Sequence, residues 1–203
     1  MSALVTVSRD SDLWIVTLNR PDKANALTSD MLSALADIAE DAQAAKALIL
    51  TGTGKVFSAG ADLDAVRQGL ATDPAWERLS GAVAAINGLT IAALNGTVAG
   101  GALGMVLACD LRIAVSGAKV FYPVMKMGVD PQPSDPGRMA ALIGPARTKM
   151  ILLAGQKIDA ETALIWGLFD RIAESDLMAE ARSLVTDVLP ADPARIAAIK
   201  SGL

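Results

Sequence analysis

The sequence contains no histidine, a single cysteine and few aromatic residues. The absence of histidine from its 203 residues excludes Ser-His-Asp and Cys-His nucleophile systems and every histidine-ligated metal site. The lone cysteine, Cys109, excludes an intramolecular disulfide and predicts a reducing, cytoplasmic location. Aromatic residues make up 3% of the chain, so we expect a core of Ala, Leu, Ile, Val and Met.

Charges are also scarce, and their balance is slightly acidic. Charged residues make up 20% of the chain and the formal net charge is −4, which argues against a nucleic-acid partner. No charge lies between Arg78 and Asp110, a stretch long enough to span a bilayer. Because Asn87, Gly88 and Asn95 interrupt this stretch, we predict two buried elements joined by a turn and no membrane partner.

Strand and helix patterns alternate along most of the chain. The β-prone runs that predict strands are residues 4–8, 13–19, 47–51, 90–94, 111–115 and 120–122. Apolar residues at helical spacing predict helices that begin after Thr28 or Ser29 and at Asp73. From Pro145 onward the pattern is mostly helical. We therefore predict an α/β core over residues 1–144 and a helical C-terminal region over residues 145–203.

Generic ligand-binding motifs are incomplete in this sequence. Gly54-Lys55 lacks both the first glycine and the Ser or Thr of a phosphate loop. Asp62 and Asp64 are a pair of possible oxygen ligands, but two nearby acids on a loop are usually solvated. We therefore predict no metal site.

Two glycine-containing segments are more informative, residues 57–63 and 95–104. Each follows a predicted strand and precedes a predicted helix, so each can direct backbone N–H groups into a shared cleft. Two such donors would stabilise an anion that develops on a carbonyl oxygen. The alternative is that the small residues only permit close packing of strand against helix.

Several ordered motifs resemble the crotonase, or enoyl-CoA hydratase/isomerase, superfamily, and the resemblance covers nearly the whole chain. The segments that carry it are Asn19-Arg20-Pro21-Asp22-Lys23-Ala24-Asn25-Ala26-Leu27, Ala59-Gly60-Ala61-Asp62-Leu63, Asn95-Gly96 with Gly100-Gly101, Cys109-Asp110-Leu111-Arg112-Ile113-Ala114, and Gly155 through Ala163 to Trp166-Gly167-Leu168-Phe169-Asp170-Arg171-Ile172. The resemblance implies a spiral core of ββα units with a helical C-terminal region, assembled as a trimer or a dimer of trimers.

The same resemblance implies an activity on acyl-CoA thioesters in fatty acid metabolism. Coenzyme A is then the carrier of the substrate, and no cofactor is permanently bound. Family members stabilise a thioester enolate in an oxyanion hole of two backbone N–H groups, at positions that match Ala61 and Gly101.

Coenzyme A recognition follows from the same positions. The positions that match the backbone around the adenine are Ala59, Asp62 and Leu63. The loop that matches the one near the nucleotide carries Arg20, Lys23 and Ala24. The two cations can attract the phosphates of the carrier to an acidic protein, or they can belong to an ordinary solvated loop.

The sequence departs from the family pattern where proton transfer occurs. Family hydratases carry two glutamates, at positions that match Gly104 and Val124 here, and neither residue can exchange a proton. Asp130 is the first candidate to replace them and Asp135 the second, and a third alternative is that no side chain acts as the catalyst. Tyr122 can donate a hydrogen bond to a substrate or simply end a strand.

We therefore expect a lyase or isomerase of this family with altered proton-transfer residues. The alternative is a non-catalytic acyl-CoA-binding or assembly subunit, and a structural subunit that binds no coenzyme A is a third hypothesis. Family members usually continue through further helices that cover the acyl-CoA site. The sequence stops soon after Lys200, so we expect a shortened C-terminal region and a more open pocket.

Overall fold

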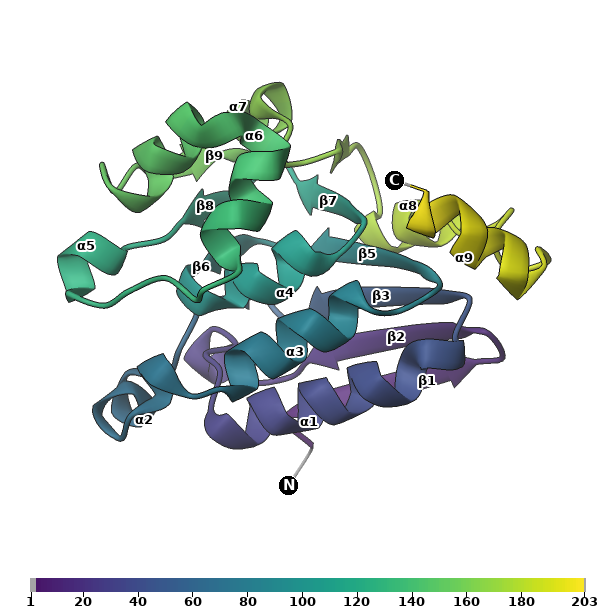
Figure 1. Cartoon of the computed structure of the whole chain (residues 1–203), viewed down its shortest axis with the longest axis horizontal. Helices are drawn as coiled ribbons and strands as arrows, with labels where there is room; N and C mark the ends of the chain where they lie inside the picture. The colour runs from purple at the N-terminus through teal and green to yellow at the C-terminus, as the bar shows by residue number, and fades with distance from the viewer. Residues whose placement is uncertain (1–2, 203) are drawn as a thin grey trace.

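The computed structural model describes residues 3–202, which form repeated strand–strand–helix units followed by further helices (Figure 1). The strands are β1 (Val5–Asp10), β2 (Leu13–Leu18), β3 (Ala47–Gly52), β4 (Val56–Ser58), β5 (Leu89–Leu94), β6 (Thr97–Ala99), β7 (Leu111–Val115), β8 (Lys119–Phe121), β9 (Ile158–Asp159) and β10 (Arg171–Ala173). The helices are α1 (Ser29–Asp41), α2 (Leu63–Arg67), α3 (Ala75–Ala84), α4 (Leu103–Ala108), α5 (Val124–Met127), α6 (Asp135–Leu152), α7 (Ala160–Trp166), α8 (Leu177–Ser183) and α9 (Pro193–Ser201).

The larger sheet has the strand order β1-β2-β3-β5-β7-β10. After the antiparallel β1–β2 hairpin, every neighbouring pair in this sheet is parallel. Parallel strands are covered on both faces, which explains why β3 and β5 are nearly continuous apolar runs.

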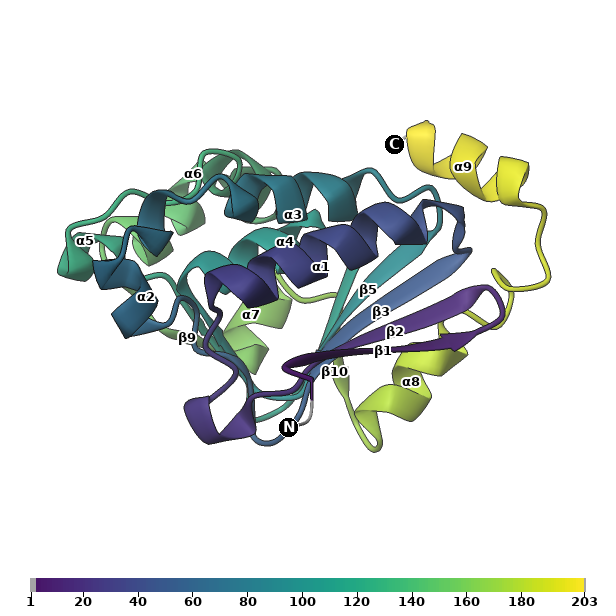
Figure 2. The same cartoon turned by 90° about the horizontal axis from the view of Figure 1, so that it is seen from below.

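Helices cover both faces of this sheet (Figure 2). Helices α1, α3 and α4 lie on one face, and α8 lies on the other. The first face carries the larger core, which includes Leu48, Leu50 and Phe57. The second face carries a smaller core in which Ile49 and Ile91 pack with Ala181 of α8. Successive residues of β3 therefore point to opposite cores, as the alternation of side chains along a strand requires.

The smaller sheet positions the loops that follow its strands. Its order is β4-β6-β8-β9, and the β4–β6 and β6–β8 pairs are parallel. The carboxyl ends of three adjacent parallel strands therefore meet at one edge. The segments that continue from these ends are residues 59–62, 100–102 and 122–123.

The sequence predictions for the strands and helices of the core are mostly confirmed. The N-terminal hairpin is present, and the Thr28 side chain caps α1 by accepting a hydrogen bond from the Met31 N–H at 3.3 Å. Residues 79–109, which carry no charge, form parts of α3, β5, β6 and α4 instead of one long helix, and most of them are buried. The stretch therefore contains more elements than the two that were predicted. None of the helices formed by residues 3–202 is both long and apolar enough to cross a membrane.

The C-terminal part differs from its predicted, mostly helical pattern. Helix α6 begins at Asp135, and Pro145 only restarts it after a kink at Gly144, whose φ is +79°. Strands β9 and β10 lie beyond this kink and extend the two sheets by pairing with β8 and β7. These strands are too short to show an alternating apolar pattern. The division at residue 144 remains a prediction.

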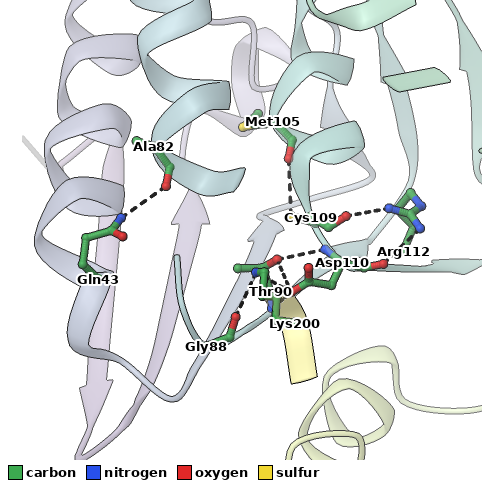
Figure 3. Close-up of polar contacts among 9 residues, drawn as sticks. All are labelled: Gln43, Ala82, Gly88, Thr90, Met105, Cys109, Asp110, Arg112 and Lys200. Atoms are coloured by element: carbon green, nitrogen blue, oxygen red, sulfur yellow. Dashed lines mark hydrogen bonds and ion pairs between the residues drawn. The ribbon is translucent and has the colours of Figure 1, made fainter. Parts of the chain in front are cut away.

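Polar contacts attach the C-terminal helix to the core (Figure 3). The Lys200 ammonium group of α9 lies 2.8 Å from the Asp110 carboxylate and donates to the Gly88 carbonyl at 3.0 Å. The same carboxylate oxygen accepts hydrogen bonds from the Thr90 N–H and hydroxyl, both at 2.8 Å. Cys109 is buried beside this network, and burial raises the pKa of its thiol to about 12. The thiol is therefore protonated at neutral pH and contributes no nucleophile.

Candidate functional site

A mostly apolar pocket opens where the carboxyl ends of β4, β6 and β8 meet. Its walls bring together residues that are far apart in the sequence, and three of the predicted catalytic positions are among them. The lining residues are Ala59, Ala61, Leu63, Val66, Ala71, Trp76, Gly100, Gly101, Tyr122, Pro123, Val124, Met127, Val129, Asp130 and Gln132.

The backbone N–H of Ala61 does not take part in the hydrogen bonds that join Gly60 and Asp62 to Leu27. The Leu27 N–H donates to the Gly60 carbonyl, and the Asp62 N–H donates to the Leu27 carbonyl, each at 2.8 Å. In this parallel bridge the Ala61 N–H lies between the two bonds and points away from Leu27. Because Ala61 also lines the pocket, its N–H is available for a ligand.

The two glycine segments touch each other at the pocket wall. Gly60 has a φ of +91°, and a Cβ there would come within 2.7 Å of the Ala99 carbonyl oxygen. A Cβ on Gly101 would lie 3.0 Å from the Trp76 ring. Position 60 therefore requires glycine, whereas a side chain at position 101 would require the Trp76 ring to shift. This packing also exposes the Gly101 backbone, just before α4, to the same pocket as Ala61.

The buried Asn25 side chain fixes the loop that carries several predicted binding residues. Its amide oxygen accepts a hydrogen bond from the Arg20 N–H at 2.8 Å, and its amide nitrogen donates to the Thr53 and Val56 carbonyls. The Ala59 N–H also donates to the Ala24 carbonyl, at 2.9 Å. These bonds hold the loop of residues 20–26 against the first glycine segment.

Arg20, Lys23 and Asp62 line a second hollow beside this loop. Arg20 is engaged there, because its guanidinium donates to the Asp62 carboxylate at 2.7 Å and to the Ala26 carbonyl at 2.9 Å. The hydrogen bond from Arg20, helped by those from the backbone of α2, lowers the pKa of the Asp62 carboxyl. Lys23 is exposed at the rim of the hollow. Among these three side chains, Lys23 is therefore the cation that is free to meet an anion.

The acidic candidates lie in different environments. Asp130 is exposed on the pocket wall. Asp135 is fully buried behind that wall, where its Oδ2 atom accepts a hydrogen bond from the Tyr122 hydroxyl at 2.9 Å. A Cβ on Gly104 would lie only 3.0 Å from Asp135 Oδ1. The space for this carboxyl group thus depends on the absence of a side chain at position 104.

Burial dominates the protonation of this pair. It raises the pKa of Asp135 to about 7. The hydrogen bond from Tyr122 lowers this pKa, the charge of Glu77 raises it further, and the charge of Arg138 lowers it. Burial, together with the Asp135 charge, also raises the pKa of Tyr122 well above its ordinary value. Without a ligand, Asp135 therefore titrates near neutral pH, whereas the Tyr122 hydroxyl is protonated there.

Sequence reasoning missed the connections among these residues. Tyr122 and Asp135 were separate candidates, and Asn25 and Trp76 were assigned no role at the site. The sequence signal for Asn25 was its place in the first family-like motif, and the structure adds that its backbone is left-handed, with φ at +52°. For Asp135 the sequence signal was an acidic residue in a chain that has Gly104 where the family resemblance places a glutamate. Only the fold shows that Asp135 and Gly104 lie side by side.

Comparisons with known proteins agree with one another. The family model described as enoyl-CoA hydratase/isomerase matches residues 8–203. A probable enoyl-CoA hydratase, echA8, of Mycobacterium tuberculosis is 34% identical over 206 residues, which cover 95% of this chain and 79% of the relative. The carnitinyl-CoA dehydratase of Salmonella enteritidis is 33% identical over 98% of this chain and 80% of its own.

Solved structures give the same result. DspI of Pseudomonas aeruginosa superimposes with a TM-score of 0.90 at 31% identity, over 98% of this chain and 86% of that one. An enoyl-CoA hydratase from Bacillus anthracis has a TM-score of 0.89 at 27% identity, over 98% and 81% of the two chains. The ββα arrangement expected from the sequence is therefore confirmed.

The raised pKa of Asp135 predicts a pH dependence of stability that Asp135→Asn removes. Below about pH 4 both the folded and unfolded states hold this proton, and between about pH 4 and about pH 7 only the folded state does. Relative to Asp135→Asn, the wild-type free energy of unfolding should therefore fall by up to about 1.4 kcal/mol per pH unit across this range. Urea denaturation of both proteins at several pH values measures the difference, and parallel curves would contradict the assignment.

Proposed function

The chain belongs to the enoyl-CoA hydratase/isomerase family, and from that premise we propose that it binds an acyl-CoA thioester and stabilises its enolate. The observation that carries the proposal is that Ala61 and Gly101 line one pocket, with the Ala61 N–H turned away from its neighbouring strand. Backbone N–H groups at these positions form the oxyanion hole for the thioester oxygen. Such fixed donors stabilise a developing anion without reorganisation during the reaction.

Coenzyme A enters along the loop that Asn25 fixes. The proposed contacts are Ala59, Asp62 and Leu63 around the adenine, with Arg20, Lys23 and Ala24 near the nucleotide. The hydrogen bond from Ala59 to Ala24 supports a shared surface for these two groups. Because Arg20 is paired with Asp62, Lys23 supplies the free positive charge for the phosphates.

The proposed reaction class is that of a lyase or isomerase acting on enoyl-CoA, as in fatty acid metabolism. The similarity to a probable enoyl-CoA hydratase and to a carnitinyl-CoA dehydratase supports this class. The second candidate function is that of a non-catalytic acyl-CoA-binding or assembly subunit. It is favoured because Gly104 and Val124 cannot exchange protons.

The proposed assembly is a homotrimer or a dimer of trimers in the cytoplasm. Large apolar side chains are exposed on neighbouring helices, which supports burial against another copy of the chain. They include Met150 of α6 and Leu164 and Ile165 of α7.

Incubation of the protein in deuterated water with crotonyl-CoA or a 3-enoyl-CoA, followed by mass spectrometry, tests the proposed function. We expect hydration, double-bond migration or deuterium uptake, because an enolate held in the pocket exchanges protons with its surroundings. Binding in calorimetry without any of these changes would favour the non-catalytic candidate. A failure to bind either thioester would contradict both.

Lys23→Gln tests the coenzyme A end of the site. Removal of an exposed charge beside the phosphates should weaken butyryl-CoA binding about two- to fivefold, and the difference should shrink at high salt. Lys149→Gln, which removes an exposed charge from α6, is the matched control and should leave the Kd unchanged. Equal Kd values for the two variants in calorimetry would place the phosphates elsewhere.

A further inference from the structure

Tyr122 and Asp135 form a buried polar pair at the edge of the pocket. Tyr122, which follows β8, is 4% exposed, and Asp135, at the start of α6, is fully buried. The Tyr122 hydroxyl donates to Asp135 Oδ2 at 2.9 Å and accepts from the Gln132 N–H at 3.2 Å. One donor and one acceptor therefore fix the position of this hydroxyl group.

The second oxygen of the carboxyl group is unusual. Asp135 Oδ1 is buried and finds no hydrogen-bond partner among residues 3–202. An unpaired buried carboxylate oxygen is costly, since it loses its hydration without compensation. Glu77 and Ser134 hold the start of α6 in place, with hydrogen bonds from the Ser134 N–H and hydroxyl to the Glu77 carboxylate at 3.1 and 3.0 Å. Strained or costly polar groups of this kind are frequent at functional sites.

The two members of the pair stand at different depths. Tyr122 is part of the pocket wall, as are Ala61 and Gly101, whereas Asp135 lies behind it. A ligand in the pocket can therefore touch Tyr122, whereas Asp135 does not line the pocket and is connected to it by its hydrogen bond with the Tyr122 hydroxyl.

We propose that the Tyr122 hydroxyl exchanges a proton with the acyl chain of the bound thioester, and that the buried Asp135 carboxylate accepts and returns the tyrosine proton. This inference rests on the proposed function and assigns the proton-transfer group that the function leaves open. Tyr122 is the catalytic residue because it meets the substrate. Asp135 is a positioning residue that acts through Tyr122.

The transfer balances without any further reactant. A C–H bond at the α or γ carbon breaks, and its electron pair moves into the thioester to form the enolate. The proton joins Tyr122 Oη while the tyrosine proton passes to Asp135 Oδ2. Reversal at the other carbon returns both protons and moves the double bond. Because burial strongly disfavours a free tyrosinate, the two transfers occur together.

The pH dependence of exchange should follow the ionisation of Asp135. The charged or titratable groups that act on this carboxyl are Tyr122, Glu77 of α3 and Arg138 of α6, and α4, which places Gly104 beside it, contains no charged or titratable residue. The two coupled proton transfers, through Tyr122 to Asp135, form a relay that needs the carboxylate form of Asp135. The rate of deuterium exchange should therefore rise with pH through about 7. A structural role for Asp135 would not give this profile.

Tyr122→Phe and Asp135→Asn test the relay in the deuterium-exchange assay. We expect each variant to lose about 100-fold or more of the exchange rate, and the double variant to lose little more than either, because the residues act in one step. Binding of butyryl-CoA should remain within about threefold of wild type, and the residual exchange of Asp135→Asn should lose the pH profile. Glu161→Gln, on the exposed face of α7, is the control and should exchange normally.

Other outcomes overturn the relay in distinct ways. If both variants bind butyryl-CoA and exchange at the wild-type rate, the relay does not operate. If only Asp130→Asn abolishes exchange, the exposed Asp130 is the catalyst instead. If wild-type protein binds thioesters but exchanges nothing, the relay fails while acyl-CoA binding stands. If it binds none, the proposed function fails with the relay.

Circular dichroism checks that each variant folds. If Tyr122→Phe does not fold, the exchange rate of Asp135→Asn, which keeps the shape of the side chain, tests the relay alone.

Discussion

The close approach of the Asp135 carboxyl group to Gly104 is the constraint on which the site depends. The carboxyl oxygen lies 3.0 Å from the position of a Cβ on residue 104, so any side chain there would have to displace it. The resemblance to the family places a glutamate at this position in the hydratases. Here α4 carries none, and a carboxyl group from α6 borders the same space instead. The protein thus has a buried carboxyl group, that of Asp135, next to Gly104.

The fold brings these groups together through its short strands. β4, β6 and β8 pair in parallel, and the chain leaves their adjacent carboxyl ends toward Ala61, Gly101 and Tyr122. Close packing of the two glycine segments, at Gly60 against Ala99, sets the distance between the first two ends. Ala61, Gly101 and Tyr122 therefore follow adjacent ends of one sheet, and Phe57, Val98 and Val120 of these strands pack in the larger core.

Much of this architecture could be predicted from the sequence, because apolar runs and cap residues act locally. The Thr28 cap of α1 was predicted correctly, and the uncharged stretch of residues 79–109 forms several short elements with turns between them, where two were predicted. Strands β4, β6, β9 and β10 were missed because two or three residues carry no periodicity. The Tyr122–Asp135 pair was missed for a different reason. A contact across 13 residues depends on how the intervening turn and α5 fold, and no local pattern encodes that path.

The buried carboxyl group of Asp135 is coupled to the thioester pocket through Tyr122. The most direct test is a carbon-13 NMR titration of aspartate carboxyl groups, with and without butyryl-CoA, in which the signal absent from Asp135→Asn identifies the residue. We expect a midpoint at about 7 that rises when the ligand displaces water from the pocket. A signal that titrates in the ordinary range of aspartate, or one that the ligand does not shift, would contradict it.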